Sequence, residues 1–192
     1  MNLELKSFDT PNKIKKERRE VLEMDKIRVN INNKQKEVKI PTGLRMIVRR
    51  CCNAVLKIEE IKGDIDVSVS FVNNEEIKEL NKKYRNKDCA TDVLSFSTME
   101  NGKYTVDPAT GATVLGDVVI SIEKAQEQSE KYGHTLQREV SYLTAHSMLH
   151  LLGYDHEQGG LEKIRMREKE ERVIIQLGFP GVSGYIIDER DV

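Results

Sequence analysis

The chain of 192 residues is 33% charged, and its 31 Lys and Arg nearly cancel its 32 Asp and Glu to leave a formal net charge of −1. This balance excludes a global basic field that would hold nucleic acid, so such binding needs a local patch. No apolar run approaches the roughly 18 residues that span a membrane, and the N-terminus lacks the apolar core of a signal peptide. We therefore expect no membrane association and a single globular domain.

Cysteine usage indicates a reducing compartment. The three cysteines are odd in number, two of them are adjacent, and no C-x-x-C motif occurs. A disulfide framework is therefore not expected. Proteins without such a framework are typical of the cytosol, so we predict a cytoplasmic location.

Composition divides the chain into a tail, a domain and a second tail. Residues 1–24 hold few apolar side chains and a basic run at 12–19, and we predict a charged, disordered extension. The run could contact RNA, although a plain solvated tail is the simpler interpretation. The predicted domain covers residues 25–178, and residues 179–192 form a C-terminal tail.

Hydrophobic periodicity predicts alternating strands and helices that give way to helices alone. In chain order we expect a strand at 24–31, a helix at 42–60, a strand at 64–72, a helix at 74–84, strands at 92–96 and 115–121 separated by a loop at 101–111, and helices at 122–132, 135–152 and 161–177. This order predicts an α/β (α+β) fold, in which a small mixed sheet is covered by helices.

Three of the four histidines fall within eleven residues, at 146, 150 and 156. Residues four apart on a helix lie on one face, so the imidazoles of His146 and His150 can reach one ion. Gly153 can end the helix in a left-handed turn, which lets the chain fold back and deliver His156 as a third ligand. The sequence therefore predicts a metal site at the end of a central buried helix.

Three nitrogen ligands leave one tetrahedral position open, which is typical of a catalytic zinc site and not of a structural one. We predict one zinc ion per chain. The alternative is a pair of unrelated core histidines, because residues 142–152 carry no charge and read as buried. Buried imidazoles need partners, and one ion would satisfy both. His134 lies outside the cluster and is interpreted as structural.

The spacing H-x-x-x-H-x-x-G-x-x-H also matches metzincin proteases, but those place a Glu directly after the first histidine. Here that residue is Ser147, whose hydroxyl cannot act as general base at neutral pH. Asp155 could orient a ligand or cap the turn after the helix. Glu139 could also support His146 from one helical face, although an acidic residue in a first turn is explained by the helix dipole.

A basic cluster precedes the predicted strand at 92–96. It contains Lys82, Lys83, Arg85 and Lys87. Arg85 could clamp a phosphate in the bidentate manner that Lys cannot, or the cluster could be a solvated helix end. Asp92, which opens an apolar strand, needs hydrogen-bond partners if it is buried.

Three segments together resemble the YbeY-type rRNA maturation factors, which are metal-dependent, single-strand-specific endoribonucleases. They are Thr91–Phe96, Leu115–Ser121 and His146–His156, and the similarity runs from about Met24 to Leu177. The resemblance implies an α/β fold and zinc held by His146, His150 and His156. It also implies roles for Arg85 and His146 in catalysis or RNA engagement. The chain departs from the family in Ser147, where Gly is usual, and in its two extensions.

The resemblance further implies action on the 3′ end of small-subunit (16S) rRNA and in ribosome quality control. Single-stranded RNA, rRNA and ribosomal particles would be its partners, with ribosomal proteins or assembly GTPases as further ones. We therefore expect a zinc-dependent endoribonuclease. Two alternatives are a non-catalytic ribosome-assembly factor with a structural metal site, and a metzincin-like metallohydrolase or protease.

Overall fold

The computed structural model describes residues 25–155 and 160–179. Ten elements follow one another along the chain: β1 (Ile27–Asn33), α2 (Leu44–Ile58), β2 (Ile65–Val72), α3 (Asn74–Arg85), β3 (Val93–Ser97), β4 (Thr105–Val106), β5 (Thr113–Ser121), α4 (Ile122–Lys131), α5 (Leu136–Leu151) and α6 (Leu161–Gln176). The part of the chain thus described contains no helix with the length and hydropathy needed to cross a bilayer.

The sheet is mixed, as the sequence predicts. Its strands lie in the order β1-β2-β5-β3, and β4 pairs with β5 outside this path. The pairs β1–β2 and β2–β5 are parallel, whereas β3 and β4 run antiparallel to β5. Parallel pairs need crossover connections, and here α2 joins the first two strands.

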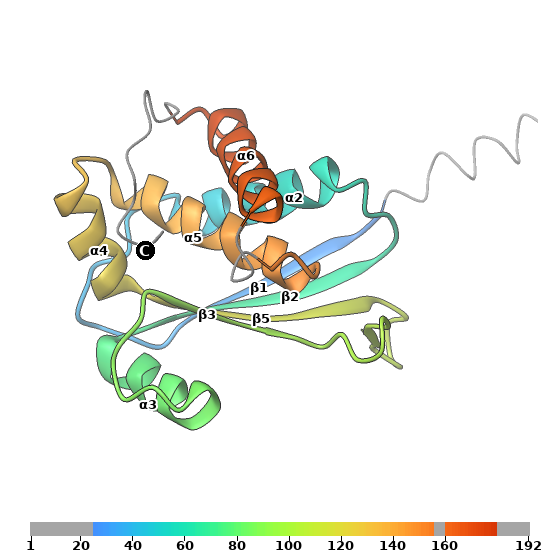
Figure 1. Ribbon diagram of the computed structural model, residues 1–192, viewed down its shortest axis with the longest axis horizontal. Helices are drawn as coiled ribbons and strands as arrows, with labels where there is room; N and C mark the ends of the chain where they lie inside the picture. Colours follow the sequence, from blue (N-terminus) through green and yellow to red (C-terminus); the bar gives the residue numbers. More distant parts are fainter. Residues whose placement is uncertain (1–24, 156–159, 180–192) are drawn as a thin grey trace, which may run out of the picture.

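Helices cover both faces of the sheet, and more of them lie on one face than on the other. Helices α2 and α5 lie side by side against one face, α6 lies outside them, and α3 lies against the opposite face (Figure 1). α5 is buried on nearly every side, as its lack of charge after Tyr142 predicts. The main core therefore fills the space between β1, β2, β5 and these helices, and a smaller cluster lies under α3.

Gly116 allows β5 to pass close to β3. Its φ is +142°, and a Cβ built on it would lie 2.0 Å from the carbonyl oxygen of Phe96 and 3.1 Å from Cδ2 of Leu151. The β2–β5 register shifts at the same place, between Asp66 and Val67. A side chain at position 116 would push apart the two strands that support the end of α5.

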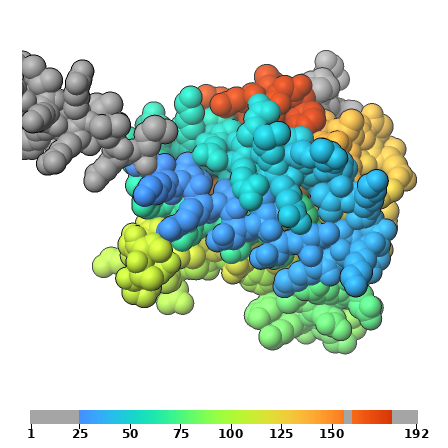
Figure 2. Space-filling model, turned by 180° about the vertical axis from the view of Figure 1, so that it is seen from behind, coloured from blue at the N-terminus to red at the C-terminus, as the bar shows by residue number. Residues whose placement is uncertain are grey.

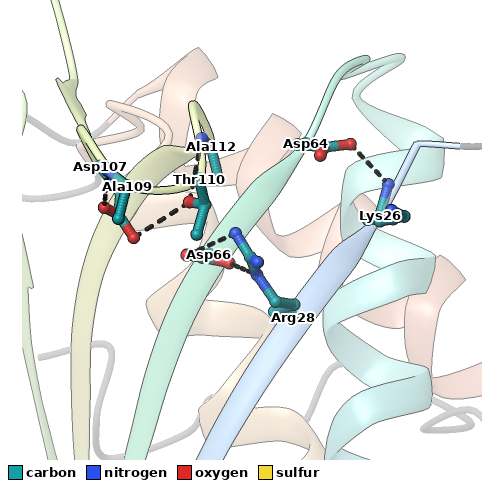
Figure 3. Close-up of polar contacts among 8 residues, drawn as sticks. All are labelled: Lys26, Arg28, Asp64, Asp66, Asp107, Ala109, Thr110 and Ala112. Atoms are coloured by element: carbon teal, nitrogen blue, oxygen red, sulfur yellow. Dashed lines mark hydrogen bonds and ion pairs between the residues drawn. The ribbon is translucent and has the colours of Figure 1, made fainter.

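Polar contacts pin the end of the sheet at which β1, β2 and β5 begin (Figure 3). Arg28 and Asp66 are register partners on β1 and β2, and the guanidinium donates from Nε at 2.6 Å and from Nη2 at 3.1 Å to the carboxylate. The carboxylate of Asp107 accepts from the Ala109 N–H at 2.8 Å and from the Thr110 hydroxyl at 3.0 Å, which lowers the pKa of Asp107. These bonds close the turn that enters β5.

The predicted elements are confirmed, with ends that shift by a few residues. β5 begins two residues before the predicted strand, because Thr113 and Val114 pair with β4. The predicted loop at 101–111 was wrong in one respect, since it contains the two-residue strand β4. Both residues of β4 are exposed, so no hydrophobic pattern marks them. The predicted extensions at 1–24 and 180–192 lie outside the described residues.

Candidate metal centre

Helix α5 begins at a side-chain cap and ends in a left-handed turn. The hydroxyl of Thr135 accepts from the N–H of Arg138 at its start. At its end the N–H of Gly153 donates to the carbonyl of His150, and the N–H of Tyr154 donates to that of Leu149. This pair of bonds is a Schellman motif, and the φ of +94° at Gly153 supplies its left-handed residue. The left-handed turn predicted at Gly153 is therefore confirmed.

The two imidazoles on this helix converge. His146 Nε2 lies 3.2 Å from His150 Nε2, and the rings meet edge to face with centroids 4.6 Å apart. Two nitrogens bound tetrahedrally to zinc at its usual bond length are separated by about 3.3 Å. The separation of the two nitrogens thus fits joint coordination of one ion.

The other ring nitrogen of each histidine fixes the tautomer. Nδ1 of His150 lies 2.8 Å from the carbonyl oxygen of Tyr154, which can only accept, so Nδ1 donates. Nδ1 of His146 lies 2.8 Å from Oε1 of Glu170 and donates in the same way. Neutral rings in these tautomers present lone pairs from both Nε2 atoms toward the same point. That donor set suits a cation such as zinc.

The Schellman turn places the carbonyl that orients His150. It reverses the chain after Leu152, so that the backbone of Tyr154 returns beneath the imidazole. The Tyr154 hydroxyl donates to Glu59 at 2.6 Å, and Lys169 donates to the same carboxylate at 2.5 Å. The turn is therefore tied to both α2 and α6.

Glu170 is the residue that sequence reasoning missed. It is 3% exposed and reaches His146 from α6. The buried residues of α6 are Met166, Glu170, Val173 and Ile174, so this carboxylate occupies the apolar stripe of its helix. A single acid in an apolar stripe was the available signal. Carboxylates that accept from a ligand histidine commonly fix its orientation.

Two other carboxylates, those of Glu139 and Asp155, were also candidates to orient a ligand histidine. Glu139 lies in the first turn of α5, fully buried, and its Oε2 is 3.0 Å from Nε2 of His134. The carboxylate that orients His146 is therefore that of Glu170 instead. His134 has the structural contact expected of it. Asp155 lies beside the histidines, in the wall of the cleft described below.

The third predicted ligand, His156, lies outside the described residues. Among residues 25–155 and 160–179 there is no group of three His, Cys, Asp or Glu able to hold a metal. The described geometry therefore brings together two of the three predicted ligands, and the metal site with His156 as its third ligand stays a prediction. The preceding residues, Tyr154 and Asp155, end directly beside the pair.

A cleft of about 640 Å³ opens over the two histidines. His146, Ser147 and His150 form one wall. Arg85 and Lys87, from the end of α3 and the segment after it, line the cleft with them, although they are about 60 positions earlier in the chain. A cleft with two cations facing two imidazoles suits a ligand that is anionic and binds metal, as a phosphodiester does.

Local structure explains why Arg85 reaches this cleft. α3 is capped at Asn73 and ends at Asn86, whose φ of +56° turns the chain toward β3. Asp92 anchors the beginning of β3, because its carboxylate accepts from the N–H of Val93 at 2.8 Å and from the side chain of Gln128 at 3.0 Å. Asp92 thus has the hydrogen-bond partners expected of it, and Val93 lines the cleft.

The predicted basic cluster divides into two parts. Arg85 and Lys87 line the cleft. Lys82 instead donates to Asp88 at 2.8 Å, a bond that raises the pKa of Lys82 and lowers that of Asp88. The Lys83 ammonium lies 4.8 Å from the centre of the Tyr84 ring. Lys82 and Lys83 therefore belong to the solvated end of the helix, which was the alternative interpretation of the whole cluster.

Comparison with known proteins identifies the family of this chain. The family described as Endoribonuclease YbeY matches residues 30–178. The chain belongs to the YbeY endoribonuclease family. Its members are named endoribonucleases, which are enzymes that cleave RNA. The family therefore supports a nuclease role for the chain, and it gives no support to the protease alternative.

Several relatives align with this chain over nearly the whole of their own length. An Endoribonuclease YbeY from Caldanaerobacter subterraneus subsp. tengcongensis is 52% identical over 156 residues, which are 79% of this chain and 98% of the relative. One from Clostridium botulinum (strain Langeland) is 43% identical over 159 residues, 76% of this chain and 95% of the relative. A solution structure from Thermotoga maritima aligns with a TM-score of 0.54 at 29% identity, covering 78% of this chain and 89% of that one.

Proposed function

We propose that this chain is a zinc-dependent, single-strand-specific endoribonuclease that matures the 3′ end of 16S rRNA and serves ribosome quality control. Its substrates would be rRNA and ribosomal particles in the cytoplasm, with ribosomal proteins or assembly GTPases as partners. The observation that carries the proposal is the pair of converging Nε2 atoms in a cleft shared with Arg85 and Lys87. Membership of the YbeY family supports RNA as the substrate.

The ligands of the proposed zinc ion would be His146, His150 and His156. When bound, the ion would supply Lewis-acid polarisation of a phosphoryl oxygen and activation of water. Glu170 and the Tyr154 carbonyl hold the two described imidazoles in the tautomer that such binding needs.

The cations of the cleft would act on the phosphate itself. The guanidinium of Arg85 can donate two parallel hydrogen bonds to the non-bridging oxygens, and so offset the negative charge that develops during cleavage. Lys87 lines the same cleft and would hold the backbone as a point charge.

Cleavage of a labelled single-stranded 16S rRNA fragment tests the proposal. The zinc-loaded protein is expected to cut the fragment, and His150→Ala is expected to lose both activity and bound zinc, the latter measured by elemental analysis. A duplex of the same sequence should resist cleavage. Equal cleavage by the parent and the His150→Ala variant would mean contamination and would refute the proposal.

A structural role for the metal is the second candidate, favoured by one observation. The site joins three parts of the fold, because His146 contacts α6 through Glu170 and His150 contacts the turn through Tyr154. An ion there would fasten these parts together in a non-catalytic assembly factor. In that case the Arg85→Ala variant would bind zinc and support ribosome assembly normally, whereas the ligand variants would lose thermal stability.

A further inference from the structure

The solvent side of α2 is cationic along its whole length. Six residues of the helix are exposed and form the α2 outer face: Arg45, Met46, Arg49, Arg50, Asn53 and Lys57. Four of the six are basic, and the helix contains no Asp or Glu. This face therefore departs sharply from the whole chain, whose net charge is −1.

Some other cations at the described surface have acidic partners. Lys34 pairs with Glu76, Lys82 with Asp88 and Lys124 with Glu127. No ion pair within residues 25–155 and 160–179 includes a basic residue of the α2 outer face. Its charges thus remain available to an external anion.

The arrangement works against the stability of the helix. Arg45 lies in the first turn, where the helix dipole favours acidic residues, and that turn contains none. Gly43 caps the helix without a side-chain hydrogen bond. Arg45 and Arg49 are four residues apart, a spacing at which like charges repel by about 0.2–0.5 kcal/mol. Lys57 lies in the last turn, where the helix dipole favours a cation, but helix stability does not explain the three arginines.

The face has the dimensions of a polyanion contact. Arg45 and Lys57 are separated by about 18 Å along the axis at 1.5 Å per residue, while each strand of a nucleic-acid duplex carries one charge per 3.4 Å. A groove of about 280 Å³ runs beside the face, and it is also lined by Gln176 and Leu177 at the end of α6. The side chain of Met46 is 61% exposed at this groove.

The α2 outer face is separate from the cleft. α5 packs against α2 on one side and against β3 on the other, and the cleft lies between α5 and β3. Figure 2 shows the molecule from behind, with the surface of α2 in cyan uncovered between β1 and α6. An RNA that contacts both sites must extend around the molecule.

We propose that the α2 outer face is a second RNA-binding surface, which holds the phosphate backbone of a structured rRNA segment while a single-stranded segment enters the cleft. The inference rests on the proposed function, because the substrate in the cleft would be continuous with a larger folded RNA. Three of its four cations are arginines, whose planar guanidinium groups match phosphate oxygens. This surface would give affinity without sequence specificity.

The test compares two RNAs and two double variants of the full chain. One RNA is an oligonucleotide of about eight unpaired nucleotides, sized to a site of roughly 4–16 nucleotides, and the other joins it to an rRNA hairpin. In Arg49→Glu/Arg50→Glu, the Kd for the hairpin RNA is expected to rise about tenfold or more, and the slope of log K against log salt to fall by about 2. Arg49→Lys/Arg50→Lys preserves the charges and is expected to bind as the parent does.

The cleavage of the short oligonucleotide separates the two proposals. The charge-reversal variant is expected to cut it with the parental kcat/KM, because the α2 outer face does not line the cleft. Unchanged hairpin affinity in that variant would overturn the inference, as would an equal loss for both RNAs. Loss of binding to ribosomal particles alone, with hairpin affinity kept, would indicate a protein partner and also overturn it. A parent that binds the hairpin RNA but never cleaves would refute only the proposed function.

Discussion

The orientation of His146 by Glu170 leads to the sharpest prediction. The carboxylate is 3% exposed, and its Oε1 lies 2.8 Å from Nδ1 of the imidazole. Glu170→Ala removes the acceptor and leaves a buried N–H without its partner. Glu170→Gln keeps the volume and removes the charge, so it isolates the electrostatic part of the contact.

The magnitude follows from the kind of hydrogen bond. Bonds to a charged group contribute about 1.5–3 kcal/mol, which corresponds to about a 10- to 100-fold change in an equilibrium constant. We expect zinc affinity to fall about tenfold in Glu170→Gln and about 100-fold in Glu170→Ala. Competition against a chromogenic zinc chelator measures this directly, without any assay of activity.

The same helix offers a matched control. Glu168 is exposed and lies two residues before Glu170, so Glu168→Gln makes the same chemical change away from the site. It should leave zinc affinity at the parental value. If Glu170→Gln binds zinc as tightly as the parent, the charge of the carboxylate does not support the ligand; if Glu170→Ala does so too, the acceptor for Nδ1 of His146 has no role in zinc binding and the reasoning is refuted.

Three further predictions concern the cleft, the sheet and the thiols. Arg85→Ala should lower kcat/KM for single-stranded RNA by about 100-fold or more while zinc affinity stays parental; a loss below threefold would exclude Arg85 from phosphate contact. Gly116→Ala should lower the free energy of unfolding by about 3 kcal/mol or more in urea titrations, because its Cβ would overlap a backbone oxygen at 2.0 Å. Gly63→Ala is the control, because nothing lies within 4 Å of the added Cβ and only the φ of +96° opposes it; its free energy of unfolding should fall by about 1–2 kcal/mol. Equal losses of stability in the two variants would contradict the overlap at Gly116. A thiol reagent should modify one cysteine of the native protein, the exposed Cys89, since burial closes the α2 thiols to reagents and raises the pKa of Cys52 to about 12; three fast-reacting thiols would show that the α2 core opens.

Local patterns predicted much of the architecture. Alternation in residues 65–72 and the helical periodicity of residues 44–58 identify elements that the structure contains almost as expected. Each signal lies within one element, where the period of the side chains follows from backbone geometry alone. The strand β4 escaped prediction because its two exposed residues owe their conformation to pairing with β5.

The candidate site divides in the same way. The pairing of His146 with His150 and the left-handed turn at Gly153 depend on residues within one helix and its end, so spacing alone was sufficient to expect them. The contact of Glu170 could not be predicted in this way. Its place in the apolar stripe of α6 indicates that the side chain is buried, but only the packing of α6 on α5 decides that it meets His146.

The sequence by itself determined that two imidazoles share one helix face, that the helix is buried, and that it ends in a left-handed turn. Helical geometry fixes these features over a few residues. Only the tertiary structure decided that Arg85 and Lys87 face the histidines, and that Glu170 orients one of them. Those contacts join segments far apart in the chain, and their geometry depends on how α3, α5 and α6 pack around the sheet.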